Sequence, residues 1–497
     1  MKVKNFYHLN LISSIKTEVN MTSRVNPASS TPLPPIAEEV VNDCESTINN
    51  VAGVLKVPGH IRGFSNYDLS EQTVFNKWKQ ITGKSFASYG FSPVELRPFE
   101  LREHLEAKGG IGKQIFGVYR MDGNLITDLG LPFDHTLPLA LFVAQRHREI
   151  PFPFMRQAIG VVYRGENPQA GRFRAFYQAD VDVIAPKLEL TSDAECLASL
   201  MTALTELNIG TFTTYINHIG IVYGILDAFA IPEDLRKNVL TELDKADKVS
   251  EEELFTNLQK ILAGIPKKEI ENLMEVFSFR GPIEKFPIEN YSEQTKQAYS
   301  DLCEIVDTLR AFGINTEAIQ VAPNIVRGLD YYTGLVFETF LHGKEQYGSI
   351  MSGGRYDKLV ETFQSDVHLE GVGGSIGLTR LFDILSRHGE IPKREVSTSD
   401  IFVGYRTKEQ KQFAISLARK LREYGANVTL YPNKSNIKKQ LTYASRLGVP
   451  VALLAMDHDS FVVKNMYDLQ DKKGTDCPTQ DAAIEHSLQL LRSNEQN

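Results

Sequence analysis

Apolar positions recur with different periods along the chain, and these periods predict where strands and helices alternate. From about residue 45 to 185 the pattern is mixed. It predicts a helix over Thr73–Thr82, a strand over Gly90–Pro98 and a short strand with a turn over Asp128–Thr136. A Gly- and Pro-bearing loop then leads into a returning strand over Phe173–Ile184.

Residues 190–320 favour helices. The run Ser192–Glu195 predicts the start of a helix that continues to about Leu207, and Ser250 followed by three glutamates predicts another start. A strand-rich pattern resumes at Val321 and gives way to a helix from about Ile376 to His388.

Residues 399–497 alternate strand and helix, which predicts a separate α/β domain. The expected strands are Ile401–Gly404, Asn427–Tyr431 and Val449–Ala455, and the expected helices are Lys408–Tyr424 and Ile437–Leu447. This segment is also basic: ten Lys and Arg residues stand against three acidic residues between 400 and 450, in a chain of net charge −8. It is either a phosphate-facing surface or a solvated helix face.

Composition narrows the class of protein. A chain of 497 residues with 42% hydrophobic and 23% charged residues predicts two to four globular domains. No apolar run approaches the ~18 residues of a transmembrane helix. The four cysteines form no CxxC pair, which argues against a zinc site and a disulfide framework and fits a reducing compartment. Residues 1–44 predict a flexible polar tail, and we expect a cytoplasmic protein, with import into an organelle left open by the lightly basic tail.

The stretch Arg327–Gly334, RGLDYYTG, places an arginine and an aspartate among aromatic residues just ahead of an apolar strand. A charge held there must be paired or bound to a ligand, because bare burial in low dielectric costs too much. An Arg327–Asp330 ion pair under a β-turn is the alternative to a ligand-binding role.

Three further stretches favour the ligand-binding role over the ion pair. They are Tyr163–Gln178 (YRGENPQAGRFRAFYQ), Ser352–Asp357 (SGGRYD) and Gly371–Arg380 (GVGGSIGLTR). Together with RGLDYYTG they resemble histidyl-tRNA synthetases, a family of class II aminoacyl-tRNA synthetases. The first resembles motif 2, the last resembles motif 3, and the other two resemble the histidine-specific signatures. The resemblance covers about residue 55 to the end.

The resemblance implies an α/β fold of the α+β type. Its class II antiparallel catalytic sheet, flanked by helices, would occupy 45–395, with a helical insertion at about 225–318. An α/β anticodon-binding domain would occupy 399–497. The motif 1 region, here Gly90–Pro98, builds the dimer interface in the family, so a homodimer is expected.

The implied activity is that of a histidine–tRNA ligase. It activates L-histidine with ATP to histidyl-adenylate and then transfers histidine to the 3′ end of tRNA(His). ATP is expected as a substrate together with Mg²⁺, and neither a protein-bound metal nor a membrane partner is expected.

Arginine suits phosphate binding because its planar fork is permanently charged and donates in pairs. By resemblance, Arg164 contacts the α-phosphate, Phe176 and Arg380 enclose the adenine, and Glu166 meets the adenine edge. The full expected ATP-binding set is Arg164, Glu166, Arg172, Arg174, Phe176 and Arg380, and the expected catalytic residues are Arg327 and Arg164.

The histidine pocket also carries over from the family by position. Asp134 and Thr136 hold the α-amino group, Asp182 receives the imidazole N–H, and Tyr332 faces the other ring nitrogen. An acid with a phenol can read both imidazole nitrogens. The full expected set is Asp134, His135, Thr136, Gln178, Asp182, Arg327, Tyr331, Tyr332 and Tyr356. Arg327 would bridge the substrate carboxylate and the α-phosphate, a role that a metal ion fills in other class II enzymes. The alternatives are a surface-exposed Asp182 and a core Tyr331.

Four positions depart from the family pattern: Pro132, His135, Ala175 and Thr379. They motivate a second hypothesis, an inert synthetase-like module that senses uncharged tRNA. Retention of the phosphate-binding arginines counts against it. A regulatory subunit of histidine biosynthesis is a third hypothesis, although such subunits typically lack the anticodon domain and an intact RGLDYY.

Overall fold

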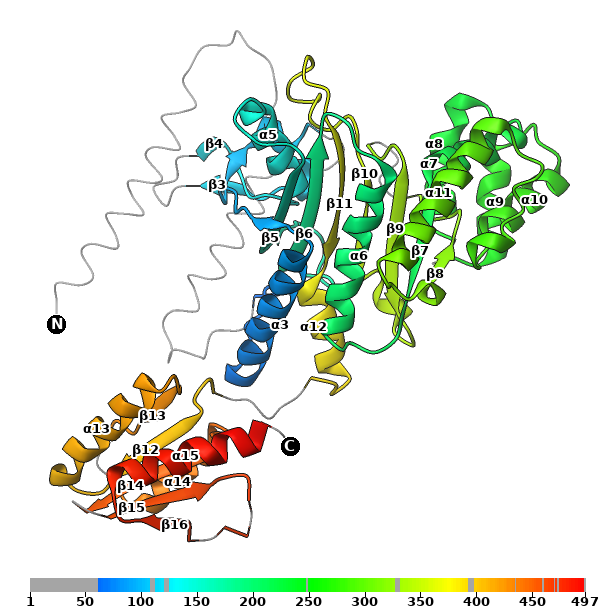
Figure 1. Ribbon diagram of the computed structural model, residues 1–497. Coiled ribbons are helices and arrows are strands. Elements are labelled where there is room, and N and C mark those ends of the chain that lie inside the picture. The colour runs from blue at the N-terminus through cyan, green and yellow to red at the C-terminus, as the bar shows by residue number, and fades with distance from the viewer. Residues whose placement is uncertain are drawn as a thin grey trace, which may run out of the picture. The chain divides into compact units, whose positions relative to one another are not determined.

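The computed structural model describes ten stretches of the chain, among which the elements of Figure 1 are placed. They are residues 61–107, 112–119, 125–246, 249–326, 331–391, 397–433, 435–457, 460–468, 470–471 and 473–495. The predicted tail at 1–44 lies outside these residues, and so do Arg327 and Asp330.

An eight-stranded sheet organises the larger part of the chain. Its order is β1-β5-β6-β11-β10-β9-β7-β8, and only the outer pairs β1–β5 and β7–β8 are parallel. The strands in that order are Ser92–Pro93, Phe154–Tyr163, Ala175–Ala185, Glu370–Ile376, Met351–Arg355, Leu335–Leu341, Phe212–His218 and Ile319–Val321. The expected antiparallel sheet is therefore confirmed for its central strands, and the two parallel outer pairs make the whole sheet mixed.

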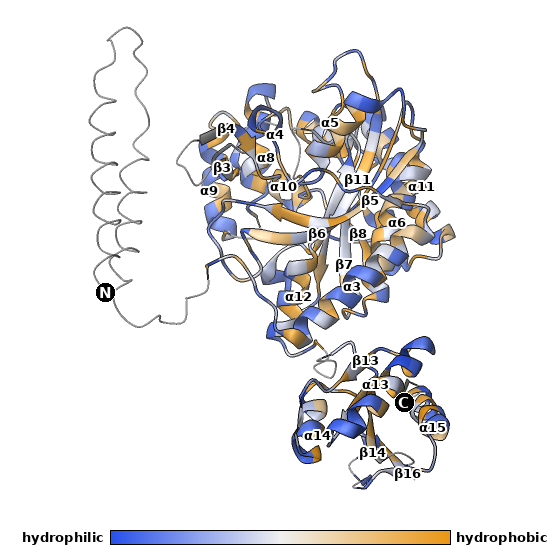
Figure 2. Cartoon of the chain, turned by 90° about the vertical axis from the view of Figure 1, so that its left-hand side faces the viewer, coloured by the Kyte–Doolittle hydropathy of each residue, from blue (hydrophilic) through white to orange (hydrophobic). Residues whose placement is uncertain are grey.

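Three helices pack against one face of this sheet: α3 (Leu69–Ser88), α6 (Leu190–Glu206) and α12 (Leu378–Arg387). Helix α3 begins at a capping box, in which Asp68 accepts the N–H of Glu71 and Glu71 accepts the N–H of Asp68. Figure 2 shows hydrophilic residues along α3 and apolar residues along β6, as expected where a helix covers a core.

Strand β6 divides its side chains between the two faces of the sheet. Ala179, Val181 and Val183 belong to the main core with the helices. Successive residues of a strand point to opposite faces, so Gln178, Asp180 and Asp182 lie on the face away from that core. Polar side chains thus gather on the uncovered face, where the candidate site lies.

A helical block follows β7 in the chain, and its largely buried faces join the main core. Its helices are α7 (Ile219–Ala228), α8 (Glu233–Leu243), α9 (Glu251–Ile261), α10 (Lys267–Phe277) and α11 (Glu293–Ala311). Ser250 caps α9 by accepting the N–H of Glu253, as the sequence predicts.

A small three-stranded sheet accompanies the large one near the start of the described chain. Its order is β2-β4-β3, built from Glu100–Leu101, Leu125–Gly130 and Gly117–Tyr119. The helices α4 (Arg102–Leu105) and α5 (Thr136–Arg146) belong to this region. Single 3-10 turns occur at Gly112–Gln114, Ile283–Lys285, Thr316–Ala318 and Glu345–Tyr347.

The C-terminal segment forms its own five-stranded sheet, β13-β12-β14-β15-β16. The strands in that order are Val428–Leu430, Ile401–Tyr405, Val451–Asp457, Ser460–Asn465 and Thr475–Cys477, and the helices are α13 (Lys408–Glu423), α14 (Ile437–Arg446) and α15 (Gln480–Glu495). All five elements predicted between 401 and 455 are present. The sheet has separate hydrophobic clusters of its own, one including Leu417 and Ile484 and one including Ala444.

Three local predictions are wrong. Strand β1 contains only Ser92–Pro93, because Pro93 has no N–H to donate to a longer ladder, although the N–H of Val94 still donates to the carbonyl of Gln157 on β5. The stretch 190–320 is not wholly helical, since it contains β7, which pairs with β9. Helix α6 begins at Leu190 without a side-chain cap, and Asp193 is buried and bonded to Arg355 instead. Within the described residues no helix has the length and apolar character needed to cross a membrane.

Candidate active site

Strand register builds the floor of the site from residues far apart in the sequence. Asp182 on β6 lies opposite Arg156 on β5 and Gly373 on β11. In the next row of the same face, Asp180 lies opposite Ser375, which in turn lies opposite Ser352 on β10. Charged, hydroxyl and glycine positions therefore form cross-strand rows on one face of the sheet.

A pocket over these rows brings together seven of the predicted histidine-binding residues. They are Asp134, Thr136, Gln178, Asp182, Tyr331, Tyr332 and Tyr356. The lining is completed by Arg164, Asp180, Ser352, Gly353, Gly373, Gly374 and Ser375. Because Asp182 is only 3% exposed, its interpretation as a surface residue is wrong.

Three buried polar atoms in this lining have no hydrogen-bond partner: Gln178 Oε1, Asp180 Oδ1 and Ser375 Oγ. Buried polar atoms are nearly always paired, and an unpaired one costs free energy until a partner arrives. The pocket is thus prepared for a polar ligand that brings hydrogen-bond donors.

Both carboxylate oxygens of Asp182 have protein partners. Arg156 Nη1 donates to Oδ2 at 3.0 Å, and the Tyr356 hydroxyl donates to Oδ1 at 2.6 Å. Burial raises the pKa of Asp182, while the charge of Arg156 and the hydroxyl of Tyr356 oppose that rise. Burial also raises the pKa of Tyr332 and Tyr356 well above the usual value, so both phenols keep their protons.

The loop before α5 supplies Asp134, whose Oδ1 accepts the N–H of Leu137 at 3.0 Å. His135 follows it but does not line the pocket. Its Nδ1 lies 2.8 Å from Asp180 Oδ2, so it contacts the pocket through that carboxylate. His135 is therefore not among the residues that line the pocket, and its histidine-binding role stays a prediction.

A second pocket adjoins the first and shares Arg164, Gln178, Ser352 and Ser375 with it. It also brings together Glu166, Arg172, Phe176 and Arg380 of the predicted ATP-binding set. Arg174 is not among the residues lining either pocket, and its Nε donates to the carbonyl of Glu166 at 3.2 Å.

Arg164 lies between two aromatic rings. Its guanidinium carbon is 4.3 Å from the ring centroid of Phe133 and 5.0 Å from that of Phe176. Burial lowers the pKa of Arg164, with Asp134 and Glu166 opposing the shift, and a guanidinium stays charged in proteins regardless. A permanent cation is therefore held where the two pockets meet.

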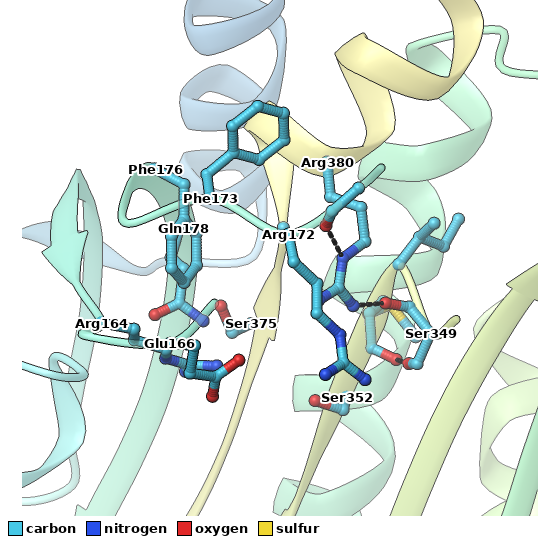
Figure 3. Close-up of a pocket in the computed structure, with 14 residues that line it drawn as sticks. Arg164, Glu166, Arg172, Phe173, Phe176, Gln178, Ser349, Ser352, Ser375 and Arg380 are labelled. Atoms are coloured by element: carbon cyan, nitrogen blue, oxygen red, sulfur yellow. Dashed lines mark hydrogen bonds between the residues drawn. The ribbon is translucent and has the colours of Figure 1, made fainter. Parts of the chain in front are cut away.

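Arg380 is fixed by backbone carbonyls on the far side of the second pocket. Its Nε donates to Gly171 at 2.8 Å and its Nη1 donates to Ser349. Figure 3 shows both bonds, with Arg172 drawn beside Arg380 and with Phe176 and Gln178 on the other side. The pocket thus presents cationic groups on more than one side, as a polyphosphate requires.

Two arginines in this region were missed by sequence reasoning. Arg156 donates to Asp182 from the neighbouring strand β5, and Arg355 binds Asp193, Asp357 and Glu370 at 2.7, 3.0 and 2.5 Å. Asp357 also accepts the hydroxyl of Thr333 at 2.6 Å, which ties the end of RGLDYYTG to SGGRYD. The SGGRYD motif contained the signal for Arg355, but nothing local marked Arg156.

Comparisons with known proteins agree with this arrangement. A family model described as histidyl-tRNA synthetase matches residues 63–381. A histidine–tRNA ligase from Clostridium tetani is 35% identical over 422 residues, covering 82% of this chain and 94% of that protein. Another from Helicobacter hepaticus is 35% identical over 412 residues, covering 80% of this chain and 91% of that protein.

A crystal structure of histidyl-tRNA synthetase from Nostoc sp. PCC 7120 has the same fold, with a TM-score of 0.75 and 28% sequence identity. The match covers 89% of this chain and 100% of that one. The family-model match spans more than half of the sequence, and the aligned relatives are matched over nearly their whole length. The chain belongs to the histidyl-tRNA synthetase family.

Proposed function

We propose that this protein is a histidine–tRNA ligase. In the first step the histidine carboxylate attacks the α-phosphorus of ATP, which gives histidyl-adenylate and releases pyrophosphate. In the second step a ribose hydroxyl at the 3′ end of tRNA(His) attacks the acyl carbon, which gives histidyl-tRNA and releases AMP.

The observation that carries this proposal is the junction of the two pockets. One is lined by three aspartates and three tyrosines, and the other by three arginines. Arg164 lines both. An amino acid in the first pocket and ATP in the second would place carboxylate and α-phosphate next to the same fixed cation.

For ATP, we assign Arg164 to the α-phosphate, with Arg172 and Arg380 serving the outer phosphates. Phe176 and Arg380 would enclose the adenine, and Glu166 would accept from its amino group. Stacking of a base on an aromatic ring and a guanidinium is favourable for any base, so selection of adenine falls to Glu166.

For histidine, we assign Asp182 to the imidazole N–H and Tyr332 to the other ring nitrogen. Asp134 and Thr136 would hold the α-ammonium group, and Gln178 would contact the amino acid backbone through its unpartnered Oε1. A site with buried polar groups rejects a ligand that leaves them unpaired, and this favours histidine over apolar amino acids.

Arg327 remains the proposed second catalytic cation, bridging the substrate carboxylate and the α-phosphate. It lies outside the described residues, so its support comes from the motif and from its neighbours in the chain. Tyr331 and Tyr332, which follow it closely in sequence, line the histidine pocket.

Mg²⁺ is proposed as a companion of ATP. Within the described residues no cluster of three or more His, Cys, Asp or Glu side chains has the geometry to hold a metal ion. The oxygens of Glu338 and Asn324 line the neighbouring hollow beside Arg380, and one or two oxygen ligands with phosphates suit Mg²⁺. The ion would neutralise phosphate charge when bound.

We also propose a cytoplasmic homodimer with a catalytic domain over 45–395 and an anticodon-binding domain over 399–497. A hollow lined by Gly90, Ser92, Phe142 and Arg146 beside β1 offers a surface for a second copy. Light scattering would test the dimer directly, with a mass of twice 55.8 kDa expected.

The first step is tested by exchange of labelled pyrophosphate into ATP in the presence of each of the twenty amino acids in turn. We expect exchange with histidine alone. Absence of exchange with every amino acid would instead support an inert tRNA-binding module, and Pro132 and Ala175 would then be the first positions to restore to the family residue.

A further inference from the structure

One buried arginine lies beside Asp182 on the neighbouring strand and is not among the residues that line the histidine pocket. Arg156 on β5 is 1% exposed and has the largest volume among the fully buried side chains of the described residues. Its guanidinium cannot lose its proton, so burial at this depth requires a compensating anion. That anion is Asp182.

The pairing is fixed by the sheet itself. Arg156 and Asp182 are directly opposite residues in the antiparallel register of β5 and β6, and Nη1 lies 3.0 Å from Oδ2. The Nε of the same guanidinium donates to the carbonyl of Val94 at 3.2 Å. Bonds to strand β6 and to the chain just after β1 hold the guanidinium plane in one orientation, which in turn orients the carboxylate.

The opposite side of Asp182 is held just as closely. The Tyr356 hydroxyl donates to Oδ1 at 2.6 Å. A Cβ at Gly373, the partner of Asp182 on β11, would lie 2.3 Å from that oxygen, so only glycine leaves room for the carboxylate. Each carboxylate oxygen can accept more than one hydrogen bond, so Asp182, which lines the pocket, keeps acceptor capacity for a ligand.

We propose that Arg156 is a positioning residue for histidine recognition, which with Tyr356 holds Asp182 as an ionised, oriented acceptor for the N–H of a neutral imidazole. This inference rests on the proposed function, because there Asp182 receives the imidazole. Because Arg156 balances the charge of Asp182, this end of the pocket selects a ligand for its hydrogen-bond donor. A positive charge on the ligand side chain would add little to its affinity.

The charged and titratable groups around Asp182 agree with this role. Burial raises the pKa of Asp182, Asp180 on the same strand adds to that rise, and Arg156 and Tyr356 oppose it. The thiol of Cys196 on α6 belongs to the core on the other face of the sheet, and burial raises its pKa well above the usual value, so it adds no charge near Asp182. Without Arg156 the carboxyl would hold its proton to higher pH and would offer fewer acceptor sites.

The test is pyrophosphate exchange by Arg156→Met, in which a flexible apolar side chain replaces the guanidinium. Loss of a charge-assisted hydrogen bond corresponds to about a tenfold to hundredfold effect, so we expect the KM for histidine to rise by about that factor. The KM for ATP is expected to stay within about twofold. Arg156→Lys keeps the charge and is expected to show a smaller rise.

Gln157→Leu is the matched control. Gln157 is the next residue on β5, is buried, and binds the carbonyls of Gly83 and Phe91 on the other face of the sheet. Loss of its bonds disturbs the same strand but not Asp182. Equal increases in the KM for histidine in Gln157→Leu and Arg156→Met would show a merely structural role and overturn the proposal.

A pH series separates positioning from general damage. The ratio of the KM for histidine in Arg156→Met to that in the unaltered protein is expected to fall as pH rises from 6 to 9, because higher pH ionises Asp182 again. Titration of free histidine is the same in both assays and cancels. A ratio independent of pH would contradict the proposal.

If Arg156→Met does not fold, the KM values of Arg156→Lys and Tyr356→Phe test the positioning role of Arg156 instead. A raised KM for histidine with an unchanged KM for ATP supports the proposal, and no change in either variant overturns it. These outcomes all presuppose histidine-dependent exchange by the unaltered protein. If the unaltered protein showed no histidine-dependent exchange, the proposed function itself would be refuted. Failure of the proposed function is therefore distinguishable from failure of the positioning role of Arg156.

Discussion

The guanidinium carbon of Arg164 lies 5.0 Å from the ring centroid of Phe176, so the two groups assigned to the α-phosphate and the adenine contact each other. ATP would have to bind against both at once. The ring faces of Phe176 and Phe133 attract the guanidinium, and its Nε donates to the carbonyl of Phe133 at 3.3 Å, so these contacts keep the cation in place at a partly buried position.

Replacing Phe176 tests this arrangement. We expect Phe176→Leu to raise the KM for ATP roughly tenfold in pyrophosphate exchange, since base–aromatic stacking contributes about 1–3 kcal/mol. The KM for histidine should change less. Phe173→Leu is the matched control, because Phe173 lines the same pocket while its ring points away from Arg172 and Arg380. Equal effects of the two substitutions would remove the stacking assignment.

Gly373 predicts a steric effect at the Asp182 carboxylate. A Cβ at this position would lie 2.3 Å from Asp182 Oδ1 and 2.9 Å from the carbonyl of Val181. We expect Gly373→Ala to displace the carboxylate and to lower kcat/KM for histidine by about a hundredfold or more, as misplacement in a recognition site does. Gly264→Ala, which meets no atom within 4 Å, should leave exchange unchanged.

Much of the fold could be predicted from the sequence, and the misses have a common cause. The strands and helices between 401 and 455 follow from local periodicity, and so does the cap at Ser250. Strand β7 and the pairing of Arg156 with Asp182 do not follow from local periodicity, because both depend on pairing with segments distant in the sequence. Asp182 is 26 residues from Arg156, and no local pattern indicates that β5 and β6 align them.

The sequence motifs predicted the residues that line the site but not the residues that hold those side chains in place. Resemblance located the side chains that line the two pockets, including Gln178 and Tyr332. It gave no indication that His135 would bond to Asp180 behind the pocket or that Arg174 would bond to a backbone carbonyl. Supporting contacts depend on side-chain packing between strands, which single-sequence patterns do not encode.

Arg355 predicts a large effect on stability. It is bonded to Asp193, which is fully buried and whose pKa burial raises to about 6. Arg355→Met would leave that carboxylate without its cation, so we expect a loss of about 3–5 kcal/mol in the free energy of unfolding. Denaturant unfolding measures it. Asp193→Asn in the same chain should recover part of the loss, and a double variant no more stable than Arg355→Met would contradict the pairing argument.

His218 predicts a pH dependence of stability. Burial lowers the pKa of His218 from 6.5 to about 4, and its Nδ1 accepts the N–H of Gly220 at 3.0 Å. The unfolded chain takes up a proton below pH 6.5 that the folded chain refuses until about pH 4. The contribution of this residue is therefore complete above pH 6.5 and is lost as pH falls to 4.

The matched variant is His218→Asn, which keeps a side-chain acceptor at the start of α7 but does not titrate. We expect the unaltered protein to lose at most about 3 kcal/mol relative to this variant between pH 7 and pH 4. Urea unfolding at a series of pH values measures the difference. Parallel stability curves would show that His218 titrates normally in the folded chain.

The basic C-terminal domain predicts a separation of the two reaction steps. Lys438 and Lys439 are exposed on α14. We expect their joint replacement by glutamate to weaken tRNA binding roughly tenfold at low salt and to leave pyrophosphate exchange unchanged. Lys267 and Lys268, an exposed pair on α10, serve as the control for a general effect of charge. Equal tRNA affinity of both variants would remove α14 from the anticodon surface.

The complete aminoacylation reaction tests the proposed ligase activity. The purified protein is incubated with ATP, labelled histidine and a tRNA pool, and labelled histidine bound to the tRNA 3′ end is measured. We expect ATP-dependent charging of tRNA(His) alone, and we expect Arg164→Ala to abolish it. Binding of tRNA without any transfer of histidine, under conditions where a known ligase charges the same pool, would contradict it.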